Sequence, residues 1–373
     1  MKNILVTGGA GFIGSHLVDA LVDQGHRVKV LDLLVPQVHG PDAQVPKYLP
    51  QGVTFLRGDV ADVDAWRWAL EDVDVVFHEA AEVGVGQSMY EVVRYVRANT
   101  LGTAVMLELL ATGVYPVRRL IVASSMSIYG EGAYQCAACG PVSPQLRPVD
   151  QLAARDWEMR CPDCGRTVAP APTGEDKPLL PTSIYAISKR DQEEMCLSIG
   201  RAYGIPTVAL RYFNVYGPRQ ALSNPYTGVV AIFSSRLLNG NAPLIFEDGL
   251  QSRDFIHVSD IVRANLLAME NGRADYQVFN IGTGRSSTIL DVARILSRAL
   301  GVEIDPVVVG KFREGDIRHC FADISRARQV LGYAPQRDLE TGIAEMVTWL
   351  EAQESQDLVD RMVEELEVRG LAK

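Results

Sequence analysis

The chain has 373 residues, 47% hydrophobic and 22% charged, which is typical of a globular protein large enough to form two lobes. Its net charge of -10 argues against non-specific binding to nucleic acid, because most of the surface would repel phosphates. Every apolar run is shorter than the ~20 residues a membrane helix needs. Met1-Lys2-Asn3 leads straight into a strand pattern, so we expect a cytoplasmic protein with no signal peptide.

A glycine-rich turn lies between an apolar strand pattern at residues 4–6 and a helical pattern at 12–21. Gly9, Gly11 and Gly14 fit the spacing Gly-x-Gly-x-x-Gly, which allows a tight turn, close approach to a diphosphate and close helix packing. The free N–H groups that begin the helix would face the diphosphate. Taken alone, this spacing also fits an ordinary glycine-rich turn.

The next strand pattern favours a dinucleotide-binding turn over an ordinary glycine-rich turn. Arg27 to Leu31 leads to Asp32, 18 positions after Gly14. A carboxylate there can accept hydrogen bonds from both hydroxyls of an adenosine ribose. Strand, turn, helix and acid together predict a dinucleotide site that favours NAD over NADP.

Two further strand patterns end in residues suited to a cofactor. Val53 to Leu56 leads to Asp59, which could accept from an adenine amino group, cap a helix at 61–70, or do both. Val73 to Phe77 leads to Ala80-Ala81, where small residues would let a cofactor lie close to the backbone. We therefore expect both strand ends to contribute to the dinucleotide site.

Strand patterns continue at Leu120 to Ala123, before Ser125, and at Pro206 to Arg211. A long helical pattern at 91–111 contains Asn99. This alternation predicts an α/β fold with a doubly wound parallel sheet. Such sheets bind ligands beyond the carboxyl ends of their strands, where the polar residues named above would gather.

An irregular segment, residues 131–181, contains two Cys-x-x-Cys pairs, and a glycine follows the second cysteine of each. Paired knuckles at this separation indicate a closed, structural four-cysteine zinc ribbon. The alternatives are four reduced thiols or two disulfides. The expected ligands are Cys136, Cys139, Cys161 and Cys164.

Tyr185 and Lys189 are four residues apart in a helical pattern that extends to Tyr203, so they share one face. An ammonium beside a phenol favours the phenolate and brings the tyrosine closer to acting as a base. Tyr-x-x-x-Lys is common on solvated helices. The serine after a sheet strand and the nucleotide loop favour the catalytic interpretation.

Beyond residue 215 the alternation gives way to short mixed elements, which predict a smaller substrate lobe. Its polar turns contain four arginines, which could hold a substrate diphosphate through paired hydrogen bonds. They are Arg219, Arg253, Arg313 and Arg318. Residues 351–373 predict a charged, amphipathic helix.

These motifs identify the chain as similar to the extended short-chain dehydrogenases that act on nucleoside-diphosphate sugars, from Met1 to about Leu350. The carriers are Thr7-Gly8-x-x-Gly11-x-x-Gly14, Ser125, Tyr185-x-x-x-Lys189, Arg211-Tyr212-Phe213-Asn214-x-Tyr216-Gly217-Pro218, Arg253-Asp254-Phe255-Ile256-His257-Val258 and Arg313-Glu314-Gly315-Asp316. The resemblance implies a Rossmann fold, tightly bound NAD, a Ser/Tyr/Lys catalytic set and a nucleoside-diphosphate sugar as substrate. It also implies a homodimer that pairs helices 91–111 and 184–203.

The residues and the resemblance together predict three sets of site residues. The catalytic set is Ser125, Tyr185 and Lys189. The cofactor set is Gly8, Gly11, Phe12, Ile13, Gly14, Asp32, Asp59, Val60, Ala80, Ala81, Asn99, Tyr185 and Lys189. The substrate set is Val85, Ser127, Asn214, Arg219, Arg253, Arg313 and Asp316.

The expected domains follow the same motifs. A Rossmann domain would comprise 1–130 and 182–215, with 252–272 returning to it. The zinc-ribbon insertion is 131–181, the substrate lobe is 216–251 with 273–350, and a C-terminal helix is 351–373.

Three reactions compete within the family that the chain resembles. Its 4,6-dehydratases have an Asp-Glu pair after the catalytic hydroxyl, and its decarboxylases keep the glutamate. Here those positions are Met126 and Ser127, which favours a 4-epimerase that works through a 4-keto sugar. The residues of the motifs are most similar to those of the dTDP-L-rhamnose 4-epimerase branch of this family. The alternatives are a 4-ketoreductase or dehydratase, and a catalytically silent NAD-binding protein that holds a partner.

Overall fold

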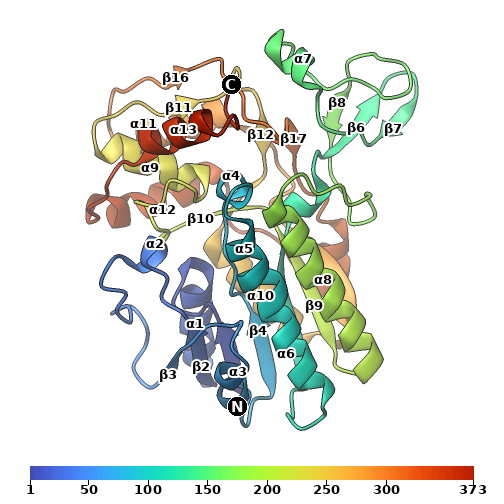
Figure 1. Ribbon diagram of the computed structural model, residues 1–373, viewed down its shortest axis with the longest axis vertical. Helices are drawn as coiled ribbons and strands as arrows, with labels where there is room; N and C mark the ends of the chain where they lie inside the picture. Colours follow the sequence, from blue (N-terminus) through green and yellow to red (C-terminus); the bar gives the residue numbers. More distant parts are fainter.

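The computed structural model describes residues 1–373 and is built on a seven-stranded parallel sheet (Figure 1). The chain starts at the interior strand β1, moves outward through β2 to β3 at one edge, and then crosses to β4 and moves outward to β14 at the other edge. This is the doubly wound arrangement expected from the sequence. In spatial order the strands are β14 (Gln277–Ile281), β9 (Thr207–Tyr212), β5 (Arg119–Ser125), β4 (Val75–His78), β1 (Asn3–Thr7), β2 (Arg27–Asp32) and β3 (Thr54–Arg57).

Helices cover both faces of the sheet, so the central strands are apolar on both sides. Helices α1 (Phe12–Asp23) and α10 (Val258–Glu270) pack together on one face. The other face carries α3 (Val63–Ala69), α6 (Gly102–Ala111) and α8 (Ile184–Tyr203). The two cores are separated by the sheet itself.

Two predicted helices differ in detail. The helix expected at 61–70 begins at Val63, and its N-cap is Asp62, whose side chain accepts from the Asp64 N–H at 2.9 Å. The capping alternative for Asp59 was therefore wrong. The helix expected at 91–111 is α5 (Val92–Tyr95), a π-helical turn η1 (Val96–Leu101) and α6 in succession.

The smaller lobe packs three helices around a separate apolar core. Its helices are α9 (Val229–Leu238), α11 (Ile289–Ala299) and α12 (Leu339–Glu351). The short strands beyond the main sheet are β10 (Asn214–Tyr216), β11 (Leu244–Ile245), β12 (Ser252–Arg253), β13 (Phe255–His257), β15 (Ser287–Thr288), β16 (Val307–Val308) and β17 (His319–Cys320). Short connecting helices are α2 (Pro36–His39), α4 (Val85–Ser88), η2 (Met126–Tyr129), η3 (Gly272–Ala274) and η4 (Ala327–Leu331).

The cysteine-containing insertion projects beside the smaller lobe (Figure 1). It holds β6 (Ala133–Cys136), β7 (Gly140–Val142), α7 (Val149–Ala153) and β8 (Ala169–Ala171), and β6 pairs with both other strands. A buried ion cluster joins it to the smaller lobe. The Arg147 guanidinium donates to both Glu247 carboxylate oxygens at 2.9 and 2.8 Å, and the fully buried Arg318 pairs with Glu247, Asp248 and Glu158.

The C-terminal segment is not the single helix predicted for 351–373. Helix α12 ends at Glu351, and α13 (Val359–Val368) begins after a non-helical stretch. Residues of this stretch form hydrogen bonds with the end of α9, and these bonds take the place of those that would continue a helix. Asn239 donates to the Ser355 carbonyl and Asn241 to the Asp357 carboxylate, which also accepts from the Val359 N–H. No helix has both the length and the apolar character to cross a bilayer.

Candidate functional site

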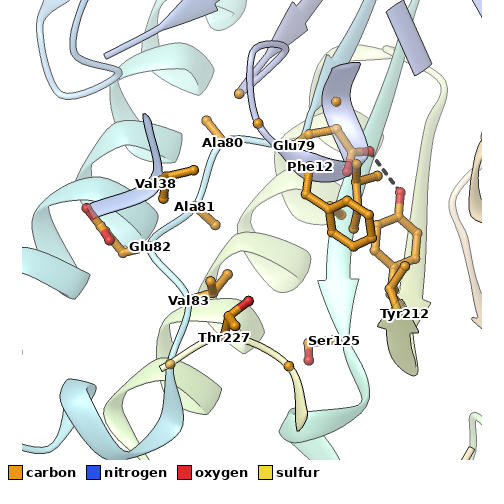
Figure 2. Close-up of a pocket in the computed structure, with 18 of the residues that line it drawn as sticks. Phe12, Val38, Glu79, Ala80, Ala81, Glu82, Val83, Ser125, Tyr212 and Thr227 are labelled. Carbon is orange, nitrogen blue, oxygen red and sulfur yellow. Dashed lines mark hydrogen bonds between the residues drawn. The ribbon is translucent and has the colours of Figure 1, made fainter. Parts of the chain in front are cut away.

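A cavity of about 460 Å³ lies at the carboxyl edge of the sheet, between the glycine-rich turn and the smaller lobe (Figure 2). All three predicted catalytic residues line it. So do twelve of the thirteen predicted cofactor residues and three of the seven predicted substrate residues. The predicted residues lining the cavity are Gly8, Gly11, Phe12, Ile13, Gly14, Asp32, Asp59, Val60, Ala80, Ala81, Val85, Ser125, Ser127, Tyr185, Lys189 and Asn214.

The glycine-rich turn is too closely packed for side chains at two positions. Gly8 has φ of +67°, and a Cβ atom there would lie 2.9 Å from the Ala80 backbone. A Cβ atom on Gly14 would lie 2.2 Å from the Gly8 carbonyl oxygen. The turn thus leaves the start of α1, with its free N–H groups, open to the cavity, which fits a bound diphosphate.

The two acidic residues predicted to contact a nucleoside, Asp32 and Asp59, line the cavity and hold local backbone. Asp32 accepts from the Ala10 N–H at 3.0 Å through Oδ2 and from the Leu34 N–H at 2.8 Å through Oδ1. Asp59 accepts from the Ala61 N–H at 2.8 Å and pairs with Arg97 at 3.0 Å. Each carboxylate oxygen has a second lone pair, so both groups can also accept from a nucleoside.

Ser125 and Tyr185 reach the cavity from β5 and α8. The Ser125 hydroxyl oxygen accepts from the Ser127 N–H at 3.2 Å and from the Ser127 hydroxyl at 3.0 Å, so its own proton is free to be donated elsewhere. The Ser183 side chain caps α8 by accepting from the Ala186 N–H at 3.1 Å. This cap places Tyr185 in the first turn, where the helix dipole favours a negative charge.

The predicted effect of Lys189 on Tyr185 stays a prediction, and the structure shows two other influences on the phenol. Burial of the ring raises the pKa of Tyr185, and it is the neighbouring Ser125 hydroxyl that opposes this rise. Lys189 is itself buried, which lowers its pKa, and its ammonium donates to Gln192 Oε1 at 2.8 Å. The four-residue spacing placed both groups on one face, but it gave no information about burial.

Glu79 is a cavity residue that the sequence reasoning missed, because it was read only as part of a stretch of small residues. It follows β4, and its Oε1 atom accepts from the Tyr212 hydroxyl at 2.8 Å (Figure 2). Burial raises the pKa of Glu79, with Tyr212 and Lys189 acting in the opposite direction. The sequence feature that could have identified Glu79 is its position as a single acidic residue directly after a buried strand.

The predicted site residues Asn99 and Asn214 differ in their position relative to the cavity. Asn99 does not line it: its side-chain oxygen accepts from the Glu82 N–H at 2.8 Å and its nitrogen donates to Ser188 at 2.9 Å. It therefore supports the backbone of the cavity wall. Asn214 does line the cavity, and its buried side-chain oxygen has no hydrogen-bond partner.

The four arginines predicted to hold a substrate diphosphate do not converge on one site. Arg219 lies outside the cavity because it pairs with Asp19 on α1 at 2.7 Å and stacks over Tyr48. The expectation that Arg318 binds a diphosphate was wrong, since its side chain is 0% exposed and fully committed to the ion cluster.

Arg253 and Arg313 do come together, on either side of Asp316. Their guanidinium groups lie 3.3 and 2.7 Å from its carboxylate. Arg253 also donates to three backbone carbonyl groups, whereas Arg313 remains 40% exposed and stacks over Phe246. These three residues do not line the cavity, so Arg313 is the freest of them to meet a ligand.

The four cysteines of the insertion converge, with their sulfur atoms all within 4.8 Å of one another. All four are free thiols, and the Sγ atoms of Cys136 and Cys164 are 3.6 Å apart. Zn–S bonds of about 2.3 Å in a tetrahedron would place sulfur atoms about 3.8 Å apart. The donor set and its spacing therefore fit a tetrahedral metal ion.

Comparison with known proteins agrees with this geometry. The NAD dependent epimerase/dehydratase family matches residues 4–148 and 164–282, and the gap falls within the insertion. A dTDP-L-rhamnose 4-epimerase from Burkholderia thailandensis is 38% identical over 351 residues, which cover 94% of this chain and 95% of that protein.

Two crystal structures of UDP-glucose 4-epimerases have the same fold. The enzyme from Thermotoga maritima, with UDP-glucose, is 35% identical with a TM-score of 0.76 and covers 94% of this chain and 98% of its own. The enzyme from Thermus thermophilus, complexed with NAD, is 30% identical with a TM-score of 0.73 and covers 94% of this chain and 100% of its own. The chain therefore belongs to the NAD dependent epimerase/dehydratase family.

Proposed function

We propose that this protein is an NAD-dependent 4-epimerase of a nucleoside-diphosphate hexose, possessing the 4-keto chemistry of its relatives and acting on a deoxyhexose such as dTDP-L-rhamnose. The observation that carries the proposal is the meeting of Ser125, Tyr185 and Lys189 with the glycine-rich turn around one cavity. The similarity to the Burkholderia enzyme supports the choice of sugar.

The cofactor would lie between the glycine-rich turn, Asp32 and Lys189. NAD supplies a hydride acceptor and a positively charged ring when it is bound. The protein's part is proton transfer and orientation: Tyr185 takes the proton of the sugar 4-hydroxyl and later returns it. Ser125, whose oxygen is already satisfied by Ser127, donates its proton to the same sugar oxygen.

The residues after Ser125 favour epimerisation over dehydration. Met126 cannot transfer a proton, and Ser127 is occupied in orienting Ser125. A dehydratase would need an acid and a base at C5 and C6. Asn214 and Arg313 are the best candidates for the substrate diphosphate, because the Asn214 amide lines the cavity with an NH2 group that can donate and the Arg313 guanidinium is partly exposed.

Two further parts of the proposal concern the whole chain. The four cysteines would hold a structural zinc ion, which would stabilise an insertion whose apolar core has only six buried residues, two of them cysteines. The protein would be a homodimer, because α5, η1 and α8 expose apolar side chains on one surface. These are Val92, Val93, Val96, Leu101 and Ile187.

The central test is the variant Tyr185→Phe. It should lose at least about 1,000-fold in kcat, within the range ascribed to a general base, while NAD and sugar-nucleotide affinities stay within about threefold. Product analysis by mass spectrometry and NMR over a panel of sugar nucleotides would identify the substrate. Turnover near that of the wild type in Tyr185→Phe, or steady release of NADH by the wild type, would contradict the proposal.

A further inference from the structure

Glu79 occupies an unusual place for a carboxylate. It is at the carboxyl end of β4, in the middle of the parallel sheet, and it lines the cavity together with Tyr185 and Lys189. A buried charge needs a partner of opposite charge or several hydrogen-bond donors to be tolerated. The groups around Glu79 therefore indicate the function of its charge.

One side of the carboxylate is anchored by a hydrogen-bond chain with a fixed direction. Asn265 Nδ2 donates to the Tyr212 hydroxyl oxygen at 2.7 Å and to the Ile261 carbonyl at 3.0 Å. Because the Tyr212 oxygen accepts from Asn265, its proton is available for Glu79, 2.8 Å away. Tyr212 thus supplies one donor, which is too little to balance a buried negative charge.

The Lys189 ammonium, in turn, has no acidic hydrogen-bond partner. Its hydrogen bond goes to the neutral Gln192 amide. The Gln192 nitrogen in turn lies 3.2 Å from His78, whose pKa burial lowers to about 3, so that imidazole is neutral at pH 7. A buried ammonium with only neutral hydrogen-bond partners would readily lose its proton.

The other titratable groups around Lys189 supply less of the missing negative charge than Glu79 does. On α8, Glu193 is paired with the Arg211 guanidinium and accepts from Ser124, while burial raises the pKa of the Cys196 thiol and keeps it neutral. Burial likewise raises the pKa values of Tyr185 and Tyr212. Glu79 is left as the counter-charge.

We propose that Glu79 is a positioning residue of this site: its half-buried, cavity-lining carboxylate is the counter-charge that keeps the Lys189 ammonium charged. The proposal rests on the proposed epimerase function and on the role predicted for Lys189 from the sequence, in which a charged ammonium favours the Tyr185 phenolate. Glu79 is assigned to act through Lys189, and Tyr185 remains the group that takes the substrate proton.

The sign of the effect follows from the environment. Burial lowers the pKa of Lys189, and the Glu79 charge raises it again. Neutralising Glu79 removes the opposing effect, so Lys189 should lose its proton at a lower pH. A group that must be protonated for activity defines the alkaline limb of a pH profile, and that limb should shift toward neutral pH.

The direct test is an NMR titration of protein with ¹³C-labelled lysine Cε atoms, in which Lys189→Met identifies the resonance of Lys189. In Glu79→Gln, which keeps the shape of the side chain and an acceptor for Tyr212, the midpoint should fall by about one pH unit or more. Glu79→Asp, which retains the charge, should titrate closer to the wild type.

Glu175→Gln is the matched control. Burial raises the pKa of Glu175 too, and its carboxylate accepts from the Asn280 N–H at 2.9 Å, but it does not line the cavity. This variant should leave the Lys189 midpoint unchanged. An unchanged midpoint in Glu79→Gln would overturn the proposal.

The kinetic readout is the pH dependence of kcat/KM, whose alkaline limb should shift by the same amount in Glu79→Gln. A merely structural role would lower thermal stability and leave both midpoints in place. The NMR titration requires neither substrate nor turnover. A protein without epimerase activity would therefore contradict the proposed function while leaving the pairing of Glu79 with Lys189 open to this test.

Discussion

At the scale of the residue, Asp32 would perform two tasks with one carboxylate under the proposed function. Its oxygens hold the Ala10 and Leu34 N–H groups, which fixes the glycine-rich turn against the end of β2. Asp32 also lines the cavity, where its remaining lone pairs would accept from ribose hydroxyls and its charge would repel a 2′-phosphate. Cofactor choice and the shape of the turn would then depend on the same side chain.

Replacing Asp32 should separate these tasks. Asp32→Ala is expected to weaken NAD binding about tenfold, equivalent to ~1.4 kcal/mol, and to narrow the preference over NADP. Asp32→Asn keeps an acceptor for one backbone group and should preserve more of the fold while also losing discrimination. Titration calorimetry with both cofactors measures the difference. Unaltered NAD affinity in a folded Asp32→Ala protein would rule out the ribose contact.

At the scale of the element, the sequence patterns located six of the seven strands of the main sheet, because buried parallel strands are short apolar runs. The seventh, β14, was wrongly assigned with residues 273–350 to the substrate lobe, because its pairing with β9 joins residues about 70 positions apart. The same patterns could not predict which charges pair. Arg318 looked like a ligand-binding residue in a polar turn, yet it is buried against Glu158 from an insertion 160 residues earlier. Glu79 was overlooked for the same reason: its partner Tyr212 is brought near only by the sheet order.

The insertion gives the second prediction. Purified protein should contain about one equivalent of zinc, and Cys161→Ser should remove most of it because three thiolates bind far less tightly. The matched control is Cys196→Ala, a buried cysteine in α8 outside the four-cysteine cluster, which should retain the metal. Elemental analysis measures both. Zinc below about half an equivalent in the wild type would count against the site.

Helix α13 gives the third prediction. Glu365 accepts hydrogen bonds from Tyr226, which lines the cavity, at 2.6 Å and from Tyr90 at 3.3 Å. Glu365→Ala should therefore loosen the cavity wall and raise KM for the sugar nucleotide several-fold, with kcat little changed. The neighbouring exposed Glu364 offers the control Glu364→Ala. Identical steady-state constants in both variants would show that α13 does not support the wall.

At the scale of the whole molecule, the apolar surface over α5, η1 and α8 should bury itself between two copies of the chain. These helices run side by side on one surface of the molecule (Figure 1). We expect a mass near twice that of one chain by light scattering. Val93→Asp, at a residue 80% exposed, should reduce it to one chain, whereas Val114→Asp, 75% exposed beyond α6, should not.

The ion cluster between the insertion and the smaller lobe has a consequence for anyone who wishes to shorten this protein. Pairing of β6 with β8 brings the two ends of the excursion together, so a short turn could bridge them. Deletion would, however, remove Arg147 from Glu247 and Glu158 from Arg318, and leave these two residues with each other and Asp248 as partners. A minimal version of the enzyme therefore calls for redesign of this cluster together with the cut.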